Sequence, residues 1–227
     1  MNQAQTAFCE WNAERLNIST EDSVARFQKS GQSVNGFDGP AFRQFCGLSY
    51  ALYGAWISDK ETEVIEAYKF HSVMAMLRMI SYPDGVPDKF DIDIETIIDY
   101  GCGIAQRSRA TAGTNADLVL VDIHTVSMDF LMWWAKRDKK PYVFMEVPVE
   151  VLPECDVCYA TGVFEHLYRP EEHFNIIDSA LRPGGYLIAN LQTHGREFMH
   201  VSPDLTAVRE RMSNYDRKGL DVYKKRR

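Results

Sequence analysis

The sequence predicts an α/β protein whose doubly wound, mostly parallel sheet follows an N-terminal helical cap. Two observations predict this class. From about residue 96 onward, short apolar segments alternate with helical segments, which is typical of parallel strands covered on both faces. Residues 1–90 instead carry helical patterns and no convincing strand. The chain has 227 residues, of which 45% are hydrophobic, enough to bury a large core. We therefore expect a helical cap over 1–90 and a sheet domain over 91–227.

The first region contains two helix-start signals. Ser19 with Asp22, and Ser58 with Glu61, have the spacing of a side chain that caps a helix and an acid in its first turn. The second signal opens a long helical stretch that stops before Pro83.

The second region is divided by its apolar runs. Strand candidates are 96–100, 118–121, 142–145, 157–160 and 186–189, with a late one at 220–223. Helical candidates are 126–137, 171–181 and 205–212. A Pro-Gly-Gly turn at 183–185 is expected to launch the fifth strand.

Charge and cysteine content exclude several classes of protein. The formal net charge of −7 works against tight binding to nucleic-acid phosphates. No apolar run reaches the ~18 residues of a membrane helix, and the first residues lack a secretory pattern. Five cysteines indicate reduced thiols in a cytoplasmic protein, with Cys155 and Cys158 as buried thiols. The basic end 224–227 is expected to be frayed and solvated.

The most informative segment is the glycine loop after the first strand. Asp99 precedes Gly101 and Gly103, and Asp122 ends the next strand. Glycines allow a tight turn and close approach of a ligand, and an acid at the second strand tip suits a ribose. A nicotinamide site would need a third glycine where Gln106 stands.

Several motifs together resemble those of class I S-adenosylmethionine-dependent methyltransferases of the small-molecule type, which have a Rossmann-like fold. The motifs are the strand and glycine loop at 97–103, the fourth-strand segment 156–167 that ends in Glu-His-Leu, and the turn at 181–187. The resemblance extends from Ile97 to Leu191. Ala105 stands where the family usually has a further glycine.

The resemblance implies a cofactor site for S-adenosylmethionine, with S-adenosylhomocysteine as the product. The methionyl end would contact Asp99, Gly101, Cys102 and Gly103; the ribose would contact Asp122; the adenine would contact Ile123, Glu146 and Val147; the methyl-bearing side would be lined by Ala160 and Thr161.

An acceptor that must lose a proton also needs a base. His166, just past the fourth strand, is the best candidate, because its pKa near neutrality suits the task; the alternative is that it only caps and packs. Tyr68 and His71 could close over the acceptor, and His194 is a further candidate, although a structural packing role is the favoured reading for all three. We expect no metal, because Gly162 stands where a related metal-dependent pattern has a ligand.

The sequence therefore predicts methyl transfer to an oxygen or nitrogen of a small metabolite, with residues 1–90 as a lid on the acceptor site. Partners would be a small-molecule acceptor, neither DNA nor a membrane, in a monomer or homodimer. Thr161–Phe164 replaces the Asn/Asp-Pro-Pro motif of DNA amino-methyltransferases. Three alternatives stay open: an RNA methyltransferase, a protein methyltransferase, and a non-catalytic protein that binds the cofactor as a partner or sensor.

Overall fold

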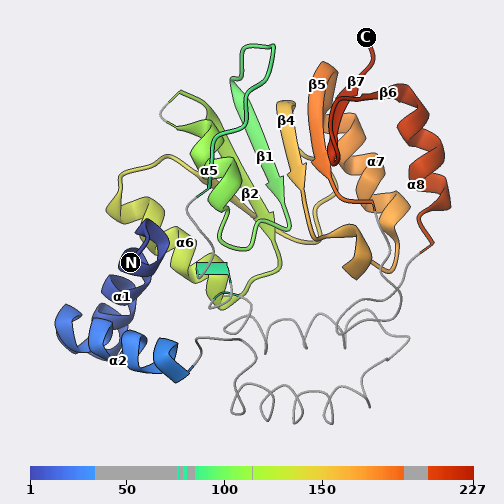
Figure 1. Ribbon diagram of the computed structural model, residues 1–227. Coiled ribbons are helices and arrows are strands. Elements are labelled where there is room, and N and C mark those ends of the chain that lie inside the picture. The colour runs from blue at the N-terminus through green and yellow to red at the C-terminus, as the bar shows by residue number, and fades with distance from the viewer. Residues whose placement is uncertain (34–75, 77–78, 81–84, 114, 192–203) are drawn as a thin grey trace. The chain divides into compact units, whose positions relative to one another are not determined.

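The computed structural model describes residues 1–33, 76, 79–80, 85–113, 115–191 and 204–227 (Figure 1). The chain divides into two compact units, Met1–Pro83 and Asp84–Arg227. The predicted helix start at 58–61 and the candidate residues Tyr68, His71 and His194 lie outside the described residues.

The first unit opens with helix α1 (Gln3–Leu16). Its start is a capping box: the Gln5 backbone N–H donates to Asn2 Oδ1 at 2.7 Å, and the Asn2 backbone N–H donates to Gln5 Oε1 at 3.0 Å. Asn17 ends the helix in the left-handed conformation, which asparagine tolerates better than most residues. Local side-chain chemistry thus sets both ends of α1.

Helix α2 (Thr20–Ser33) follows at once. Its start confirms the predicted signal, because Ser19 Oγ accepts the backbone N–H of Asp22 at 3.0 Å. The two helices pack through aromatic rings, with the centroids of Phe8 and Phe27 5.8 Å apart.

The second unit is a seven-stranded sheet in the order β3-β2-β1-β4-β5-β7-β6 (Figure 1). The strands are β1 (Thr96–Tyr100), β2 (Asp117–Asp122), β3 (Val143–Glu146), β4 (Cys155–Ala160), β5 (Leu181–Ala189), β6 (Tyr215–Arg217) and β7 (Val222–Lys225). The helices of this unit are α5 (Gln106–Ala112), α6 (Val126–Arg137), α7 (Pro170–Ala180) and α8 (Thr206–Arg211), with short 3₁₀ turns η1 (Phe164–His166) and η2 (Met212–Asn214). Strands β1 to β5 pair in parallel and β7 pairs antiparallel with β5. The fold is Rossmann-like, as predicted.

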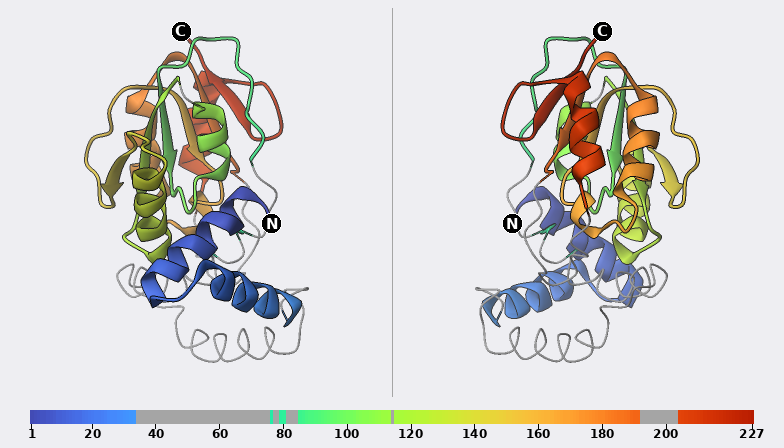
Figure 2. Two further views of the ribbon diagram at one scale, coloured as in Figure 1. Left: turned by 90° about the vertical axis from the view of Figure 1, so that its left-hand side faces the viewer. Right: turned by 90° about the vertical axis from the view of Figure 1, so that its right-hand side faces the viewer.

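Helices cover both faces of this sheet, which Figure 2 shows close to edge-on. On one face, Ser108 of α5 bonds to Asp99 of β1, and Arg109 of α5 stacks 3.4 Å from the ring centroid of Trp134 of α6. On the other face, α7 and α8 pack into one buried cluster with the sheet, and Phe174 lies in that cluster. Burial on both sides explains why the central strands are mostly apolar.

The fifth strand begins earlier than predicted. Leu181 already pairs with Cys155, and the register shifts before Tyr186 pairs with Val157. The predicted Pro-Gly-Gly turn is therefore an irregularity within β5. Gly185 is required there, because a Cβ would lie 2.7 Å from the carbonyl oxygen of Asp156.

At the amino ends of the central strands, Asp156 holds three chain segments together. The residue is 7% exposed. It accepts the backbone N–H groups of Glu95 and Thr96 at 2.9 and 3.0 Å, and Arg182 Nη1 at 3.0 Å. The acid of the fourth-strand motif thus ties the starts of β1, β4 and β5 together.

The basic C-terminal end is ordered, so the expectation that it frays is wrong. Lys224 Nζ donates to Asp91 at 2.6 and 2.9 Å, and Lys225 Nζ lies 3.1 Å from Asp178 Oδ1. Pairing of β7 with β5 and β6 brings these lysines to their acids. Along the described ranges, no helix combines the length and apolarity needed to cross a membrane.

Candidate functional site

The glycine loop turns tightly after β1. Gly101 and Gly103 have φ angles of 69° and 53°, which side chains rarely adopt. The Gly101 N–H donates to the Val121 carbonyl at 2.7 Å, so the loop is tied to the end of β2. A Cβ on Gly101 would lie 2.4 Å from Val163 Cγ2. Conformation and space therefore both require glycine at 101.

Ala105 completes the loop in a strained conformation. Its φ and ψ are 52° and 35°, and it serves as the N-cap of α5 without a side-chain hydrogen bond. A left-handed conformation costs about 1–2 kcal/mol for a residue with a Cβ. The position is the one where the resembling family usually has glycine, so the departure noted in the sequence has a structural cost. Helix α5 ends at Ala112, with Gly113 as its C-cap.

Asp99 lies at the carboxyl end of β1 and is 7% exposed. Ser108 Oγ donates a hydrogen bond to its Oδ2, and the described residues offer no hydrogen bond to Oδ1. Burial raises the pKa of Asp99 to about 7; the Ser108 bond opposes this rise and the charge of Asp122 adds to it. The structure therefore holds a desolvated carboxyl group with few partners. Ser108 had no signal in the sequence analysis.

Asp122 reaches back to the glycine loop from the tip of β2. Its Oδ2 accepts the Gly103 N–H at 2.8 Å, and its Oδ1 accepts the Ile123 N–H at 2.8 Å. Burial raises its pKa to about 6, against the lowering effect of these two bonds. Each carboxylate oxygen can accept more than one hydrogen bond. The structure thus brings Asp99, Gly103 and Asp122 together at the tips of neighbouring strands.

Cys102 lies between the two glycines and is buried. Burial raises the pKa of its thiol well above the usual range, and the nearby Asp122 and Asp99 add to the rise. Cys102 therefore contributes volume to the loop and not a thiolate.

Glu146 ends β3 and pairs in register with Asp122. The Val147 N–H donates to the Asp122 carbonyl at 3.0 Å, which fixes the chain beyond the strand. His124 lies between Glu146 and Asp129. Its Nδ1 is 3.6 Å from Glu146 Oε2, and its Nε2 is 3.1 Å from Asp129 Oδ1. No pattern in the sequence indicates that His124 is a neighbour of Glu146.

Ala160 and Thr161 stand at the tip of β4, the first buried and the second exposed. Gly162 follows with a φ of 68°, and its N–H donates to Asn190 Oδ1 at 2.6 Å. The ends of β4 and β5 are therefore joined. Asn190 was another partner that sequence reasoning missed, since it is 28 residues away.

His166 lies in the 3₁₀ turn η1 and is partly buried. The backbone N–H of His166 donates to the Val163 carbonyl at 2.9 Å. The Glu-His-Leu segment forms this turn, and the predicted helix starts beyond it, at Pro170. Proline suits the first helical position and disfavours a helical residue before it, so the turn and the helix are separate. The base role of His166 stays a prediction.

The two cysteines of β4 are packing residues and not ligands. Cys155 and Cys158 are buried free thiols, and burial raises the pKa of Cys155 to about 12. Within the described ranges, no three His, Cys, Asp or Glu side chains gather as metal ligands would.

Comparison with protein families identifies the class of this unit. Residues 98–189 match the family model of the methyltransferase domain. The match begins inside β1 and ends at the last residue of β5, so it spans the glycine loop and both acids. This region is a class I methyltransferase domain, the class that uses S-adenosylmethionine as its methyl donor.

Two solved structures share the fold at low sequence identity. An O-methyltransferase family protein from Burkholderia thailandensis has a TM-score of 0.55 and 10% identity, over 94% of this chain and 86% of that one. The [4+2]-cyclase SpnF has a TM-score of 0.50 and 15% identity, over 69% of this chain and 73% of that one. PKMT2 from Rickettsia typhi, in complex with AdoHcy, has a TM-score of 0.38 and 17% identity; 42% of this chain aligns with it, and this chain spans only 20% of its length. No curated protein matches the sequence.

Proposed function

We propose that this protein transfers the methyl group of S-adenosylmethionine to an oxygen or nitrogen of a small metabolite and releases S-adenosylhomocysteine. The observation that carries the proposal is the arrangement of Asp99, Gly103 and Asp122. Two carboxyl groups at neighbouring strand tips flank a loop that has glycine at 101 and 103, and burial raises the pKa of both carboxyl groups.

The chemistry of these acids fits a cationic nucleoside. Asp99 is desolvated and keeps an oxygen without a described hydrogen-bond donor, so an ammonium group would find an acceptor there. Asp122 already accepts backbone N–H groups through both oxygens, which orients its remaining lone pairs for ribose hydroxyls. Gly101 and Cys102 would line the methionyl end.

The neighbouring strand tips would complete the site. Ile123, Glu146 and Val147 would contact the adenine, with His124 beside the Glu146 side chain. Ala160 and Thr161 would line the methyl-bearing side. When bound, S-adenosylmethionine supplies an activated methyl group on a sulfonium, so the protein mainly orients donor and acceptor and excludes water.

His166 would accept the proton of the acceptor. If it does, His166→Ala should lower turnover by about 10²–10⁴-fold while leaving cofactor affinity nearly unchanged. Single-turnover kinetics beside calorimetry would separate the two quantities. A loss of less than about tenfold would make His166 a packing residue.

The direct test of the proposal has two stages. Calorimetry with S-adenosylmethionine, S-adenosylhomocysteine and NAD should give binding for the first two only. Incubation with a pool of small metabolites should then release S-adenosylhomocysteine. Absence of cofactor binding would refute the proposal at its first stage.

A second candidate is a cofactor-binding protein that transfers no methyl group. The fold match to SpnF favours keeping it, because a [4+2] cycloaddition transfers no group. Binding without any release of S-adenosylhomocysteine from the metabolite pool would support this candidate. RNA and protein acceptors stay alternatives. Three further points stay predictions: the lid role of residues 1–90, the cytoplasmic location, and the monomer or homodimer.

A further inference from the structure

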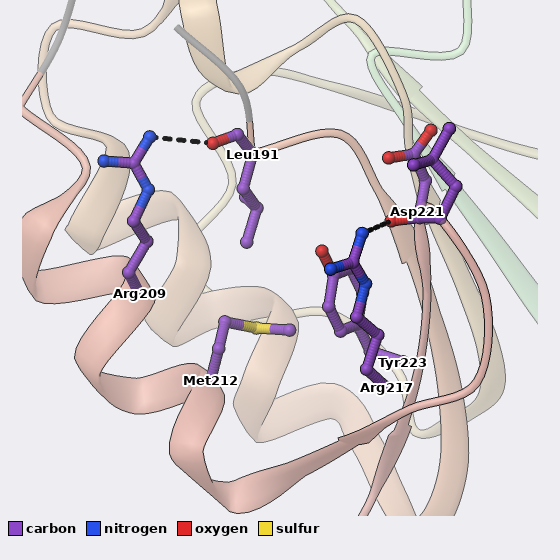
Figure 3. A pocket seen from close by; sticks show the side chains of 7 residues that line it. Leu191, Arg209, Met212, Arg217, Asp221 and Tyr223 are labelled. Atoms are coloured by element: carbon purple, nitrogen blue, oxygen red, sulfur yellow. Dashed lines mark hydrogen bonds between the residues drawn. The ribbon is translucent and has the colours of Figure 1, made fainter.

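A pocket lies on the far side of β5 from the glycine loop, between α8 and the β6–β7 hairpin (Figure 3). Its volume is about 290 Å³. Leu191, just beyond β5, is part of its wall, and so are Arg209 and Met212 from the α8 region. Arg217 and Tyr223 come from the hairpin. No residue of the proposed cofactor site lines it.

Two guanidinium groups are held at this pocket by backbone carbonyls. Arg209 Nη2 donates to the Leu191 carbonyl at 2.9 Å. Arg217 Nε and Nη2 donate to the carbonyls of Gly219 and Leu220 at 3.0 and 2.9 Å. Figure 3 shows the two side chains on opposite sides of the pocket with Leu191 between them. These bonds orient both groups before any ligand arrives, which lowers the entropy cost of binding.

Neither guanidinium forms an ion pair in the part of the chain that the structure describes; the charge of Arg209 acts on Asp204 from farther away and lowers the pKa of that carboxyl. No carboxylate oxygen lies within 4.0 Å of either, and the Nη1 atoms of both make no hydrogen bond there. Asp221 is the single acid of the wall, so the lining carries a net charge of +1. This contrasts with arginines such as Arg107 and Arg182, which pair with acids in this acidic chain.

The remaining wall is apolar. Leu191 and Met212 supply aliphatic and thioether surface, and Tyr223 supplies a ring. A guanidinium binds a carboxylate through two parallel hydrogen bonds, and apolar side chains bind the body of the same molecule. We propose that this pocket binds the carboxylate of a small organic acid with an aromatic or aliphatic body.

Benzoate is a suitable probe, because it has one carboxylate and a ring of modest size. Titration followed by protein NMR or calorimetry should give a dissociation constant on the order of millimolar. The neutral amide benzamide, which has the same shape, should bind at least tenfold more weakly. Equal binding of the two probes, or no benzoate binding, would overturn the proposal, and this comparison needs no variant.

Variants then locate the site. Arg209→Gln and Arg217→Gln should each weaken benzoate binding about tenfold. Arg211→Gln is the matched control, because Arg211 lies on the same helix but does not line the pocket; it should change nothing. A loss as large in the control as in the two pocket variants would contradict the assignment. Affinity for S-adenosylmethionine should stay unchanged in all three variants, so the failure of this site is distinguishable from failure of the proposed function.

Discussion

Two aspartates of the same sheet are equally buried but have very different numbers of hydrogen-bond donors around them. Asp99 and Asp156 are each 7% exposed. Asp156, at the amino end of β4, accepts two backbone N–H groups and an arginine. Asp99, at the carboxyl end of β1, accepts one hydroxyl group and has another acid nearby.

The difference separates an acid that holds the fold together from one that suits a ligand. A buried charge stabilises a protein only when hydrogen bonds and opposite charge replace the lost water. Asp156 has both, whereas the raised pKa of Asp99 shows that folding disfavours its charged form. A cationic ligand would supply what the chain leaves out. The comparison therefore predicts that the first acid matters for stability and the second for binding.

The largest effect on stability should come from removing Asp156, the acid that accepts three hydrogen bonds. Asp156→Ala would orphan the N–H groups of Glu95 and Thr96 and leave Arg182 without its closest acid. We expect the free energy of unfolding to fall by about 3 kcal/mol, measured by denaturant titration. The folded fraction should bind S-adenosylmethionine with unchanged affinity. A loss below about 1 kcal/mol would show that these bonds contribute little.

Removing Asp122, the proposed ribose contact, should weaken binding of S-adenosylmethionine. Asp122→Ala is expected to weaken affinity for S-adenosylmethionine by about 1–3 kcal/mol, because hydrogen bonds to an ionised group are lost. Calorimetry would measure it, with Asp117→Ala as the control, since Asp117 is exposed at the opposite end of β2. An unchanged affinity would remove the ribose assignment.

The pH dependence should distinguish Asp99 from other acids. Its pKa is raised from 3.8 to about 7 in the folded chain, so its contribution to stability is complete below pH 3.8 and is lost as the pH rises through about 7. Asp99→Asn should therefore gain stability relative to the wild type between pH 5 and pH 8. Denaturant titrations of both proteins at the two pH values would measure this.

The same titration should appear in binding. A cationic ligand prefers the ionised carboxylate, so affinity for S-adenosylmethionine should rise by up to tenfold per pH unit toward pH 7 and then level off. Asp99→Asn should reduce this slope, and what is left would reflect Asp122, whose pKa is about 6. A wild-type affinity that is flat over this range would exclude Asp99 as the ammonium acceptor.

The smallest effect concerns the loop that joins the two acids. Ala105→Gly should stabilise the protein by about 1 kcal/mol, because glycine adopts the observed left-handed conformation without strain. The thermal midpoint would measure it. Ala110→Gly, inside α5, is the matched control and should destabilise by a similar amount.

Local patterns predicted most of the sheet. Helix α6 has the expected bounds, because its apolar helical period and its flanking turns depend on residues that are close in sequence. Strand β6 was missed, since it has three residues of which two are exposed. The early start of β5 was also missed, because its first pair depends on contact with Cys155 in another strand.

The sequence by itself determined the parallel sheet, the glycine loop and the identity of its acids, since each depends on short-range spacing. Only the tertiary structure decided which groups donate hydrogen bonds to those acids. The bond from Ser108 to Asp99, the bond from Gly103 to Asp122 and the three donors around Asp156 join residues on different elements. Such contacts follow from packing of the sheet and its helices, and packing leaves no signal in neighbouring residues.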